Sequence, residues 1–272
     1  MTMAAWLAKR LITSPAGAAR RTMVTGKSRV PSGQRIYAIG DIHGRFDLAS
    51  RMFETIRAEI RELDHPTETV VIGLGDYIDR GPDSRQVLDL MCEIQEDPLF
   101  RFIGLMGNHE AMLIALLNRP GPEIEDWLSF GGVETLVSYN IAGAVHRDPR
   151  RVREAMARCL PVEQLLFLQR LRKSIAIGDY FFCHAGARPG IALAAQKDAD
   201  LMWIGNGFSD ADHEFEKVIV HGHSRVPAAD IRRHRINLDT GAYITGLLSA
   251  VVLEGSSIRL LSCRLEQGSS HE

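Results

Sequence analysis

One pattern occurs three times between residues 35 and 118, and it restricts the fold more than any other feature of the chain. An apolar run is followed at once by a polar turn that contains glycine, and then by apolar residues at helical spacing. The apolar runs predict short buried strands at 36–39, 69–74 and 100–105. The spaced apolar residues predict helices at 46–62, 83–95 and 110–118. Strands that alternate with helices form a sheet that helices cover, so the sequence predicts an α/β fold.

The chain after residue 118 has two further parts. Residues 119–172 carry mostly helical signals, which predict a helical cap inserted into the domain. Strand signals dominate from residue 174, beginning with a hairpin at the Gly178-Asp179 pair. We therefore expect one domain at 34–265, with a flexible N-terminal extension at 1–33 and a polar tail at 266–272.

Composition argues against several classes of function. The 272 residues have a formal net charge of −2, so no overall positive field attracts nucleic acid. No apolar run approaches the roughly 20 residues that span a bilayer, so we expect no stable membrane insertion. The four cysteines form no C-x-x-C pair, which is typical of the reducing cytoplasm, where we expect the protein to act. The sequence does not indicate an oligomeric state.

Candidate metal ligands gather at five predicted strand ends. They are Asp41, His43, Asp76, Asp79, Asn108, His109, His184, His221 and His223. Each one alone is more typical of an ordinary turn or a core histidine, but this many matches in one chain rarely coincide by chance. Side chains beyond the carboxyl ends of strands meet at one edge of a sheet. Asp, His and Asn together suit Mn, Fe or Zn better than Ca or Mg, and two such ions clamp a phosphoryl group and activate a water.

Five short blocks follow one another in a fixed order along the chain. They are Gly40-Asp41-Ile42-His43-Gly44, Gly75-Asp76-Tyr77-Ile78-Asp79-Arg80-Gly81, Gly107-Asn108-His109-Glu110, His184-Ala185-Gly186 and Gly222-His223. In this order they resemble the phosphoprotein phosphatase (PPP) family of metallophosphoesterases, over residues 35 to 255. The stretch at 238–242 and the cap aromatic residues resemble the bacterial branch, which includes serine/threonine phosphatases of bacteria and phages and symmetrical diadenosine tetraphosphatases. The resemblance implies a calcineurin-like α+β sandwich, with central mixed β-sheets flanked by helices.

The resemblance also implies a role for each matching residue. It implies two divalent metal ions, with Mn²⁺ as the first choice and Fe or Zn as alternatives. The implied metal ligands, with Asp76 shared between both ions, are Asp41, His43, Asp76, Asn108, His184 and His223. His109 would protonate the leaving oxygen and Asp79 would orient it, while Arg80 and Asn108 would contact the phosphate. His221 lies outside the blocks, and we expect it to support the site rather than bind metal.

Two positions depart from the family pattern. Relatives commonly carry a basic residue before Gly-Asn-His-Glu, where this chain has Met106, and an arginine where this chain has Gly205. We hypothesise that Arg188 or Arg225 replaces one of these charges as a substrate-binding group. Without such a replacement, Arg80 would be the main fixed cation left for the phosphate.

The sequence favours a metal-dependent phosphomonoester hydrolase of the serine/threonine protein phosphatase type. The alternative is a dinucleoside polyphosphate hydrolase that uses the same metal ions. Its adenosine pocket would need Trp127, Phe130 and Tyr139 of the cap, although core positions are more typical of such residues. A third hypothesis is a metal-binding module with little turnover, which only Met106 and Gly205 suggest. We therefore expect a phosphoprotein or a small phosphorylated molecule as substrate, and no nucleic acid.

Overall fold

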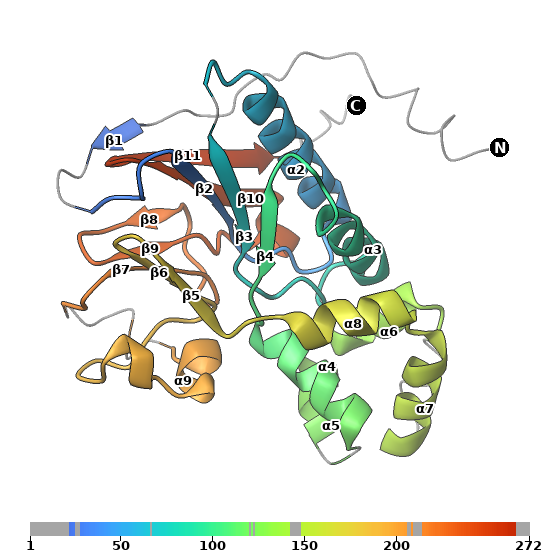
Figure 1. Cartoon of the computed structure of the whole chain (residues 1–272). Coiled ribbons are helices and arrows are strands. Elements are labelled where there is room, and N and C mark those ends of the chain that lie inside the picture. The colour runs from blue at the N-terminus through green and yellow to red at the C-terminus, as the bar shows by residue number, and fades with distance from the viewer. Residues whose placement is uncertain are drawn as a thin grey trace, which may run out of the picture.

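Two β-sheets lie face to face, and helices pack on the outer side of each (Figure 1). The computed structural model describes residues 22–24, 28–65, 67–119, 121, 123–141, 148–205, 208 and 214–264. Apolar side chains from both sheets fill the space between them, including Ile36, Val70, Phe182 and Val220. Burial of such side chains is the main source of folding free energy. The fold is therefore the pair of mixed sheets, flanked by helices, that the sequence predicts.

The first sheet places three turns of interest at one edge. Its strand order is β1-β11-β10-β2-β3-β4. The strands are β1 (Thr22–Val24), β2 (Gln34–Ile39), β3 (Glu68–Gly73), β4 (Arg101–Gly104), β10 (Leu247–Glu254) and β11 (Ser257–Arg264). β2, β3 and β4 run parallel, whereas β10 and β11 pair antiparallel. Because parallel strands end at the same edge, the turns after β2, β3 and β4 lie together.

The second sheet contributes two more turns. Its strand order is β5-β6-β7-β9-β8. The strands are β5 (Ser174–Ile177), β6 (Tyr180–Cys183), β7 (Val218–His221), β8 (Asp230–Ile231) and β9 (Arg235–Asn237). β6, β7 and β9 are parallel, and β5 pairs antiparallel with β6 as the predicted hairpin. The residues that follow β6, β7 and β9 therefore lie at a common edge of this sheet.

Helices cover the outer faces and form the cap. α2 (Phe46–Arg61) and α3 (Ser84–Ile94) pack on the first sheet through a buried cluster that includes Phe53 and Met91. α4 (Asn108–Asn118) begins directly at the turn after β4. The cap contains α5 (Glu123–Trp127), the π-helical turn η1 (Leu128–Gly132), α6 (Val133–Ser138), α7 (Pro149–Cys159) and α8 (Val162–Arg170). The remaining helical segments are η3 (Leu193–Ala195), α9 (Asp198–Trp203) and α11 (Ala242–Thr245).

The segment before residue 34 differs from the expectation. β1 pairs antiparallel with β11, Val30 is buried, and the Arg29 N–H donates to Asp179. The prediction of a flexible extension is therefore wrong for residues 22–24 and 28–33. A strand this short carries too little periodicity to detect, and the free edge of β11 supplies its hydrogen bonds. The other residues of 1–33, and the tail at 266–272, lie outside the described residues.

The region that the sequence analysis assigned to a cap is helical. Within the described part of 119–172 the chain forms helices from α5 to α8. The charged stretch that precedes Cys159 becomes α7, whose first turn is capped by the Asp148 carboxylate. Among the residues that the structure describes, no helix is both long and apolar enough to cross a membrane.

Candidate metal centre

The turns at the shared edge adopt backbone conformations that only glycine adopts easily. Asp76, Asp79 and Arg80 in the turn after β3 have φ values of 53°, 71° and 68°. His43 after β2 and His223 after β7 have φ values of 44° and 65°. Such a conformation costs a non-glycine residue about 1–3 kcal/mol and persists only where its surroundings enforce it. These turns are therefore held in place by the contacts of their side chains.

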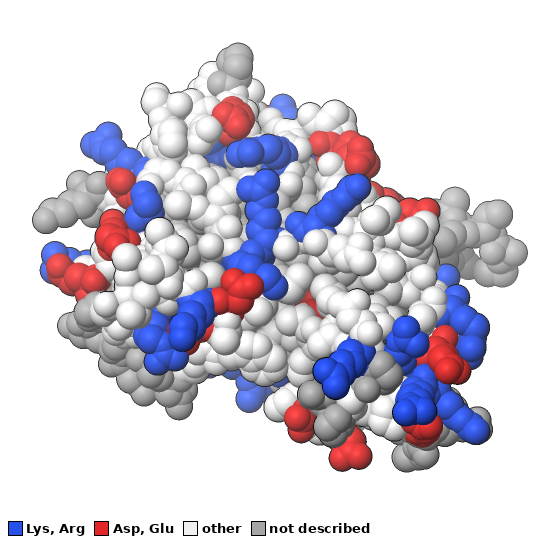
Figure 2. Space-filling view, turned by 60° about the horizontal axis from the view of Figure 1, so that its bottom comes forward, with Lys and Arg blue, Asp and Glu red and all other residues white. Residues whose placement is uncertain are grey.

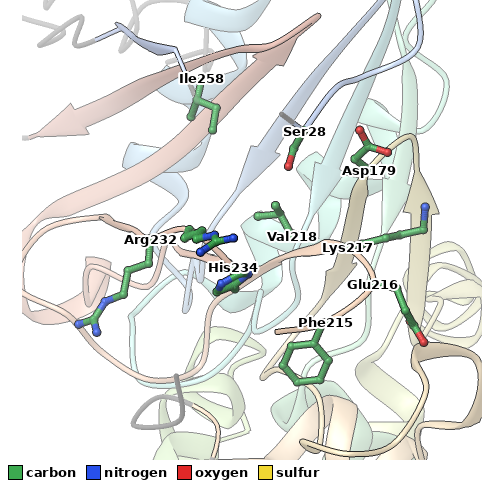
Figure 3. A pocket seen from close by; sticks show the side chains of 10 residues that line it. Ser28, Asp179, Phe215, Glu216, Lys217, Val218, Arg232, His234 and Ile258 are labelled. Atoms are coloured by element: carbon green, nitrogen blue, oxygen red, sulfur yellow. The ribbon is translucent and has the colours of Figure 1, made fainter. Parts of the chain in front are cut away.

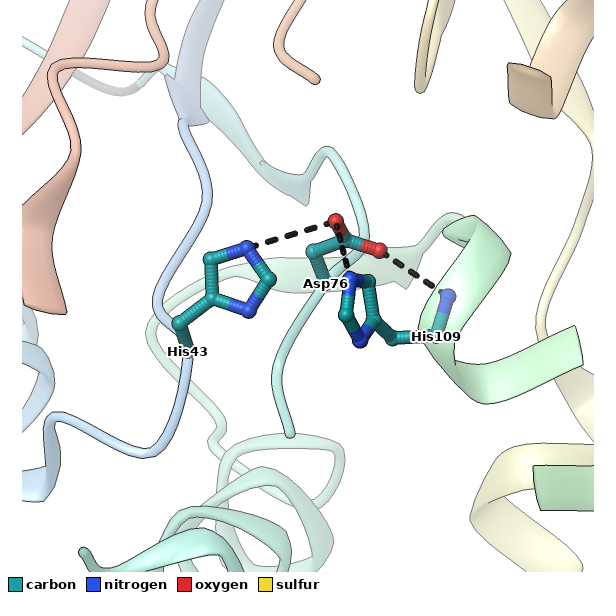
Figure 4. A group of neighbouring side chains, drawn as sticks. All are labelled: His43, Asp76 and His109. Carbon is teal, nitrogen blue, oxygen red and sulfur yellow. Dashed lines mark hydrogen bonds and ion pairs between the residues drawn. The ribbon is translucent and has the colours of Figure 1, made fainter. Parts of the chain in front are cut away.

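The first group of possible ligands joins His43, Asp76 and His109 (Figure 4). Asp76 Oδ2 lies 3.4 Å from His43 Nε2 and 3.8 Å from His109 Nε2. His43 Nδ1 lies 2.9 Å from the carbonyl oxygen of Ile78, which only accepts, so Nδ1 carries the proton. The lone pair of His43 Nε2 therefore faces the centre, where it accepts a hydrogen bond from Arg80 at 2.9 Å. Positive charge is thus attracted to the Nε2 side of His43.

The second group joins Asp76, Asn108, His184 and His223. His184 donates from Nδ1 to the carbonyl of Leu74 at 3.0 Å, so Nε2 presents a lone pair. That nitrogen lies 2.9 Å from Asn108 Oδ1, 3.2 Å from His223 Nδ1 and 3.4 Å from Asp76 Oδ1. Acceptor atoms thus face one another at short range. A proton on one of the ring nitrogens or a bound cation would relieve the repulsion between their lone pairs.

The electrostatics of this edge favour a bound cation. Burial raises the pKa of Asp76, but His184, His109 and His43 together hold the pKa of that carboxyl well below its usual value. Burial also lowers the pKa of His184, yet Asp76 and the other nearby carboxylates raise it to about 10. The carboxylates therefore draw positive charge into a buried site. A divalent ion would supply that charge more effectively than a proton on His184.

Asp41 and Asp239 add two more carboxylates. Asp41 accepts from the His223 N–H at 3.0 Å through Oδ2, whereas Oδ1 is buried without a hydrogen-bond partner. Asp239 Oδ2 is also buried without a partner. Burial raises the pKa of Asp41, and the nearby Asp239 carboxylate raises it further. Two buried carboxylates this close together need a cation to be stable as anions.

The arrangement therefore fits divalent metal ions. The donor set consists of carboxylate, imidazole and amide oxygen atoms, which suit Mn, Fe and Zn. The predicted ligands that the structure brings together are Asp41, His43, Asp76, Asn108, His184 and His223. Asp76 belongs to both groups, as a bridging ligand would.

His109 and Asp79 form a buried pair beside this centre. His109 Nδ1 lies 2.7 Å from Asp79 Oδ2, and Asp79 also accepts hydrogen bonds from Trp127 and Thr135. His109 Nε2 is buried, has no hydrogen-bond partner and points toward Asp76. Burial lowers the pKa of His109, but Asp76 and Asp79 raise it above the ordinary value. The imidazole is thus fixed in orientation and favours its proton-donating form.

A carboxylate that the sequence analysis did not assign ties the turns together. Glu110, in the first turn of α4, accepts from the N–H groups of Asp76, Tyr77, Ile78 and Gly107 at 2.8 to 3.2 Å. Burial raises the pKa of Glu110 to about 7, although these backbone hydrogen bonds favour its ionised form. Glu110 stood inside a family block, but only the structure reveals what its side chain holds.

The family model for calcineurin-like phosphoesterases matches residues 34–247, which is most of the chain. The chain belongs to the calcineurin-like phosphoesterase family. It is 33% identical over 100 residues to serine/threonine-protein phosphatase 2 of Escherichia coli (strain K12), which covers 36% of this chain and 39% of that protein. It is 30% identical over 88 residues to a symmetrical bis(5'-nucleosyl)-tetraphosphatase of Xylella fastidiosa, which covers 32% and 27% of the two chains. The matched segments thus span well under half of either relative.

A solved structure supports the same fold. The protein serine/threonine phosphatase of Saccharomyces cerevisiae superposes with a TM-score of 0.54 and 14% sequence identity. The superposition covers 89% of this chain and 83% of the yeast chain. Because the identity is low, this likeness concerns the fold alone. The relatives' names differ in substrate, so family membership leaves the substrate of this phosphoesterase open.

The two arginines hypothesised as replacements differ in their surroundings in this phosphoesterase. Arg188 forms a two-point ion pair with Asp200, and over half of its side chain is exposed. Arg225 is exposed, and the carbons of its side chain lie against Gly241. Neither guanidinium has a recorded contact with a ligand of the metal centre among the described residues. His221 is buried, and its ring contacts that of Phe208 edge to face.

A cavity of about 670 Å³ lies at the opposite end of the second sheet (Figure 3). It reaches from Val218, at the start of β7, to Ile258 of β11. Its charged groups already have partners: Arg232 pairs with Asp230, and Arg233 and His234 both lie near Glu214. The cavity is therefore separate from the metal centre of this phosphoesterase.

A substitution at Gly222 tests whether Asp41 binds metal. A Cβ atom on Gly222 would lie 1.9 Å from Asp41 Oδ1, so Gly222→Ala must displace that carboxylate. We expect this variant to bind less Mn²⁺ per chain, measured by elemental mass spectrometry after dialysis. Gly205→Ala is the control, because open space surrounds Gly205. Equal metal content in both variants would contradict the role of Asp41.

Glu110 tests the connection between the turns. Glu110→Gln places an amide N–H₂ group among backbone donors that need an acceptor, so we expect the free energy of unfolding to fall by about 1–3 kcal/mol. Urea denaturation of the metal-free chain measures this difference. Glu125→Gln, at an exposed cap position, should leave the midpoint unchanged. An unchanged midpoint for Glu110→Gln would show that its hydrogen bonds are dispensable.

Proposed function

We propose that this phosphoesterase hydrolyses phosphomonoesters with two Mn²⁺ ions and acts on phosphoserine or phosphothreonine in proteins. The observation that carries the proposal is the His109–Asp79 pair beside the shared carboxylate of Asp76. Such a pair can protonate an alkoxide leaving group, which a serine or threonine ester requires. The name of the Escherichia coli relative supports the same substrate class.

The chain's own residues would hold both ions. Asp41 and His43 would bind the first ion, Asp76 would bind both, and the second group around Asn108 and His184 would bind the other. When bound, the ions would lower the pKa of a water and polarise the phosphoryl oxygens. Asn108 would orient the phosphate through its amide N–H₂ group, because its oxygen faces the histidines.

His109 would serve as the general acid. Its Nδ1 is engaged by Asp79, so Nε2 is the nitrogen that can give a proton to the leaving oxygen. Trp127 and Thr135 donate hydrogen bonds to Asp79 and so fix the carboxylate in the orientation in which it contacts the His109 imidazole. General acids of this kind contribute about 10²–10⁴-fold to the rate.

Arg80 would bind the phosphate oxygens. Its guanidinium lies 5.0 Å from the centre of the Tyr243 ring and donates to His43 Nε2 at 2.9 Å. The backbone N–H of Arg80 donates to the Gly131 carbonyl at 3.0 Å, which connects this turn to the cap. A planar guanidinium held at the edge of the centre suits a tetrahedral phosphate.

Diadenosine tetraphosphate is the second candidate substrate, and the cap argues against it. Trp127 and Tyr139 are buried, and both donate hydrogen bonds, to Asp79 and Gln164. Neither ring is open to an adenine base. Only Phe130, of the three aromatic residues considered for stacking, is exposed, at 46%. The name of the relative from Xylella fastidiosa is the observation that supports this second candidate.

The surface argues against a nucleic-acid substrate. On the face that Figure 2 brings forward, basic side chains gather near the middle, and acidic side chains separate the other basic groups. Nucleic-acid backbones are followed by continuous positive grooves or stripes. The basic groups in this view do not extend across the face, and acidic and uncharged side chains lie between most of them.

Substitution of His109, the proposed general acid, and of Asp76, the proposed bridging ligand, should affect kcat and metal content differently. His109→Ala should lower kcat for a phosphoserine peptide by about 10²–10⁴-fold, with less effect on p-nitrophenyl phosphate, whose leaving group needs little protonation. Asp76→Asn should abolish turnover of both substrates and reduce bound metal. His65→Ala, at an exposed position, is the control.

The same assay tests metal dependence. Removal of metal with a chelator should abolish turnover, and added Mn²⁺ should restore it. Full activity of the chelated protein would overturn the proposal. Negligible turnover with two metal ions bound would instead favour a metal-binding module.

Substrate choice is tested by comparing kcat/KM for a phosphothreonine peptide and for diadenosine tetraphosphate. We expect the peptide to be preferred, because the cap offers one exposed aromatic ring rather than a stacking pocket. Phe130→Ala should leave hydrolysis of the peptide nearly unchanged. Preference for the dinucleotide, together with a raised KM for it in Phe130→Ala, would replace the proposed substrate with the second candidate.

A further inference from the structure

Lys173 places its ammonium against two sulfur atoms rather than a carboxylate. Its ammonium lies 2.8 Å from the sulfur of Met106 and 3.6 Å from the sulfur of Met202. Both thioethers are buried, and the lysine itself is half-buried. Among the described residues it has no carboxylate partner. A thioether is a weak acceptor, so among the described residues this ammonium has no strong acceptor.

The backbone places Lys173 next to the segment that leads into Gly107, Asn108 and His109. Arg172 forms a parallel bridge with Leu105, and the Met106 N–H donates to the Arg172 carbonyl at 2.8 Å. The residues at 172–173 therefore run alongside Leu105 and Met106, which continue the chain after β4. The next residue, Gly107, packs so tightly on Asp76 that a Cβ atom would lie 2.1 Å from Asp76 Oδ1.

The two sulfur atoms also hold the ammonium at a defined place. Met106 precedes the turn that carries Asn108 and His109. Met202 lies in α9, which contacts the turn after β6. The Ala185 N–H donates to the Leu201 carbonyl at 2.7 Å, which ties α9 to that turn. Lys173 thus contacts one residue next to the turn after β4, in the first sheet, and one residue of the helix that is tied to the turn after β6, in the second sheet.

We propose that Lys173 binds an anionic oxygen of the substrate's phosphate group at the edge of the metal centre. This inference rests on the proposed phosphomonoester hydrolysis. The segment between α8 and β5 would then supply a positive charge beside Met106, a position where the chain itself has no basic residue. Arg188 and Arg225, which the sequence suggested for this role, are not needed for it.

The test compares three variants of the full-length, Mn²⁺-loaded chain. Lys173→Met removes the charge while keeping an unbranched side chain of similar length, and Lys173→Arg retains the charge. Lys217→Met is the matched control, because Lys217 is a half-buried lysine at the opposite end of β7, where it donates to the Gly178 carbonyl. KM and kcat for p-nitrophenyl phosphate, and the inhibition constant of inorganic phosphate, are measured for each.

We expect Lys173→Met to raise KM and the phosphate inhibition constant by about 10–100-fold, as the loss of a charge-assisted hydrogen bond predicts. Lys173→Arg should recover at least part of the affinity, and Lys217→Met should behave as the parent protein. The thermal midpoint of Lys173→Met should not fall, because burying an unpaired ammonium does not stabilise the fold.

Two outcomes would overturn the inference. One is a phosphate inhibition constant unchanged in Lys173→Met. The other is a similar loss in Lys173→Met and Lys217→Met, which would indicate a general effect of charge. If the parent chain hydrolyses no phosphomonoester, the proposed function fails, and calorimetric titration of Mn²⁺-loaded protein with inorganic phosphate still decides the role of Lys173.

Discussion

The metal centre depends on one buried carboxylate that is not itself a candidate ligand. Glu110 accepts four backbone N–H groups, three from the turn after β3 and one from Gly107. In this way the first turn of α4 fixes the position of Asp76 relative to Asn108 and His109. Buried backbone donors must find an acceptor, and here one side chain satisfies several of them at once. Asp76, His109 and Asn108 are consequently held at fixed positions relative to one another.

These fixed positions are needed because the turns around them are strained. Among the described residues, the non-glycine residues with positive φ are mostly in the centre, and Asn140 in the cap is the exception. The strain lets short turns aim His43, Asp76 and His223 at one another. Like-charged and acceptor-rich groups then face each other in a buried place, which destabilises the metal-free fold. A bound cation relieves both the repulsion and the buried charge, so metal affinity and folding stability are coupled.

The sequence predicted the strands, and the polar side chains that meet at their ends, because both depend on local signals. An apolar run followed by Gly-Asp or Gly-Asn-His marks a strand end in any fold, and parallel pairing brings such ends together. Asp239 follows β9 in the same way and could have been found by the same rule. Glu110 and Lys173 could not, because their roles depend on which backbone lies opposite. The short strand β1 escaped detection for the same reason, since pairing with β11 rather than its own residues stabilises it.

The location of positive charge shows why chain position and spatial position must be separated. At Met106 the sequence lacks a basic residue, yet an ammonium lies on the sulfur of that very side chain. A phosphate responds to the field at a point in space, and it does not matter which strand or loop supplies the charge. Arg80 contacts Tyr243 and η1, whereas Lys173 contacts Met202 of α9, so the two cations are held by different elements. Two cations held on separate elements can be tuned independently, which allows substrate affinity to change while the metal ligands remain as they are.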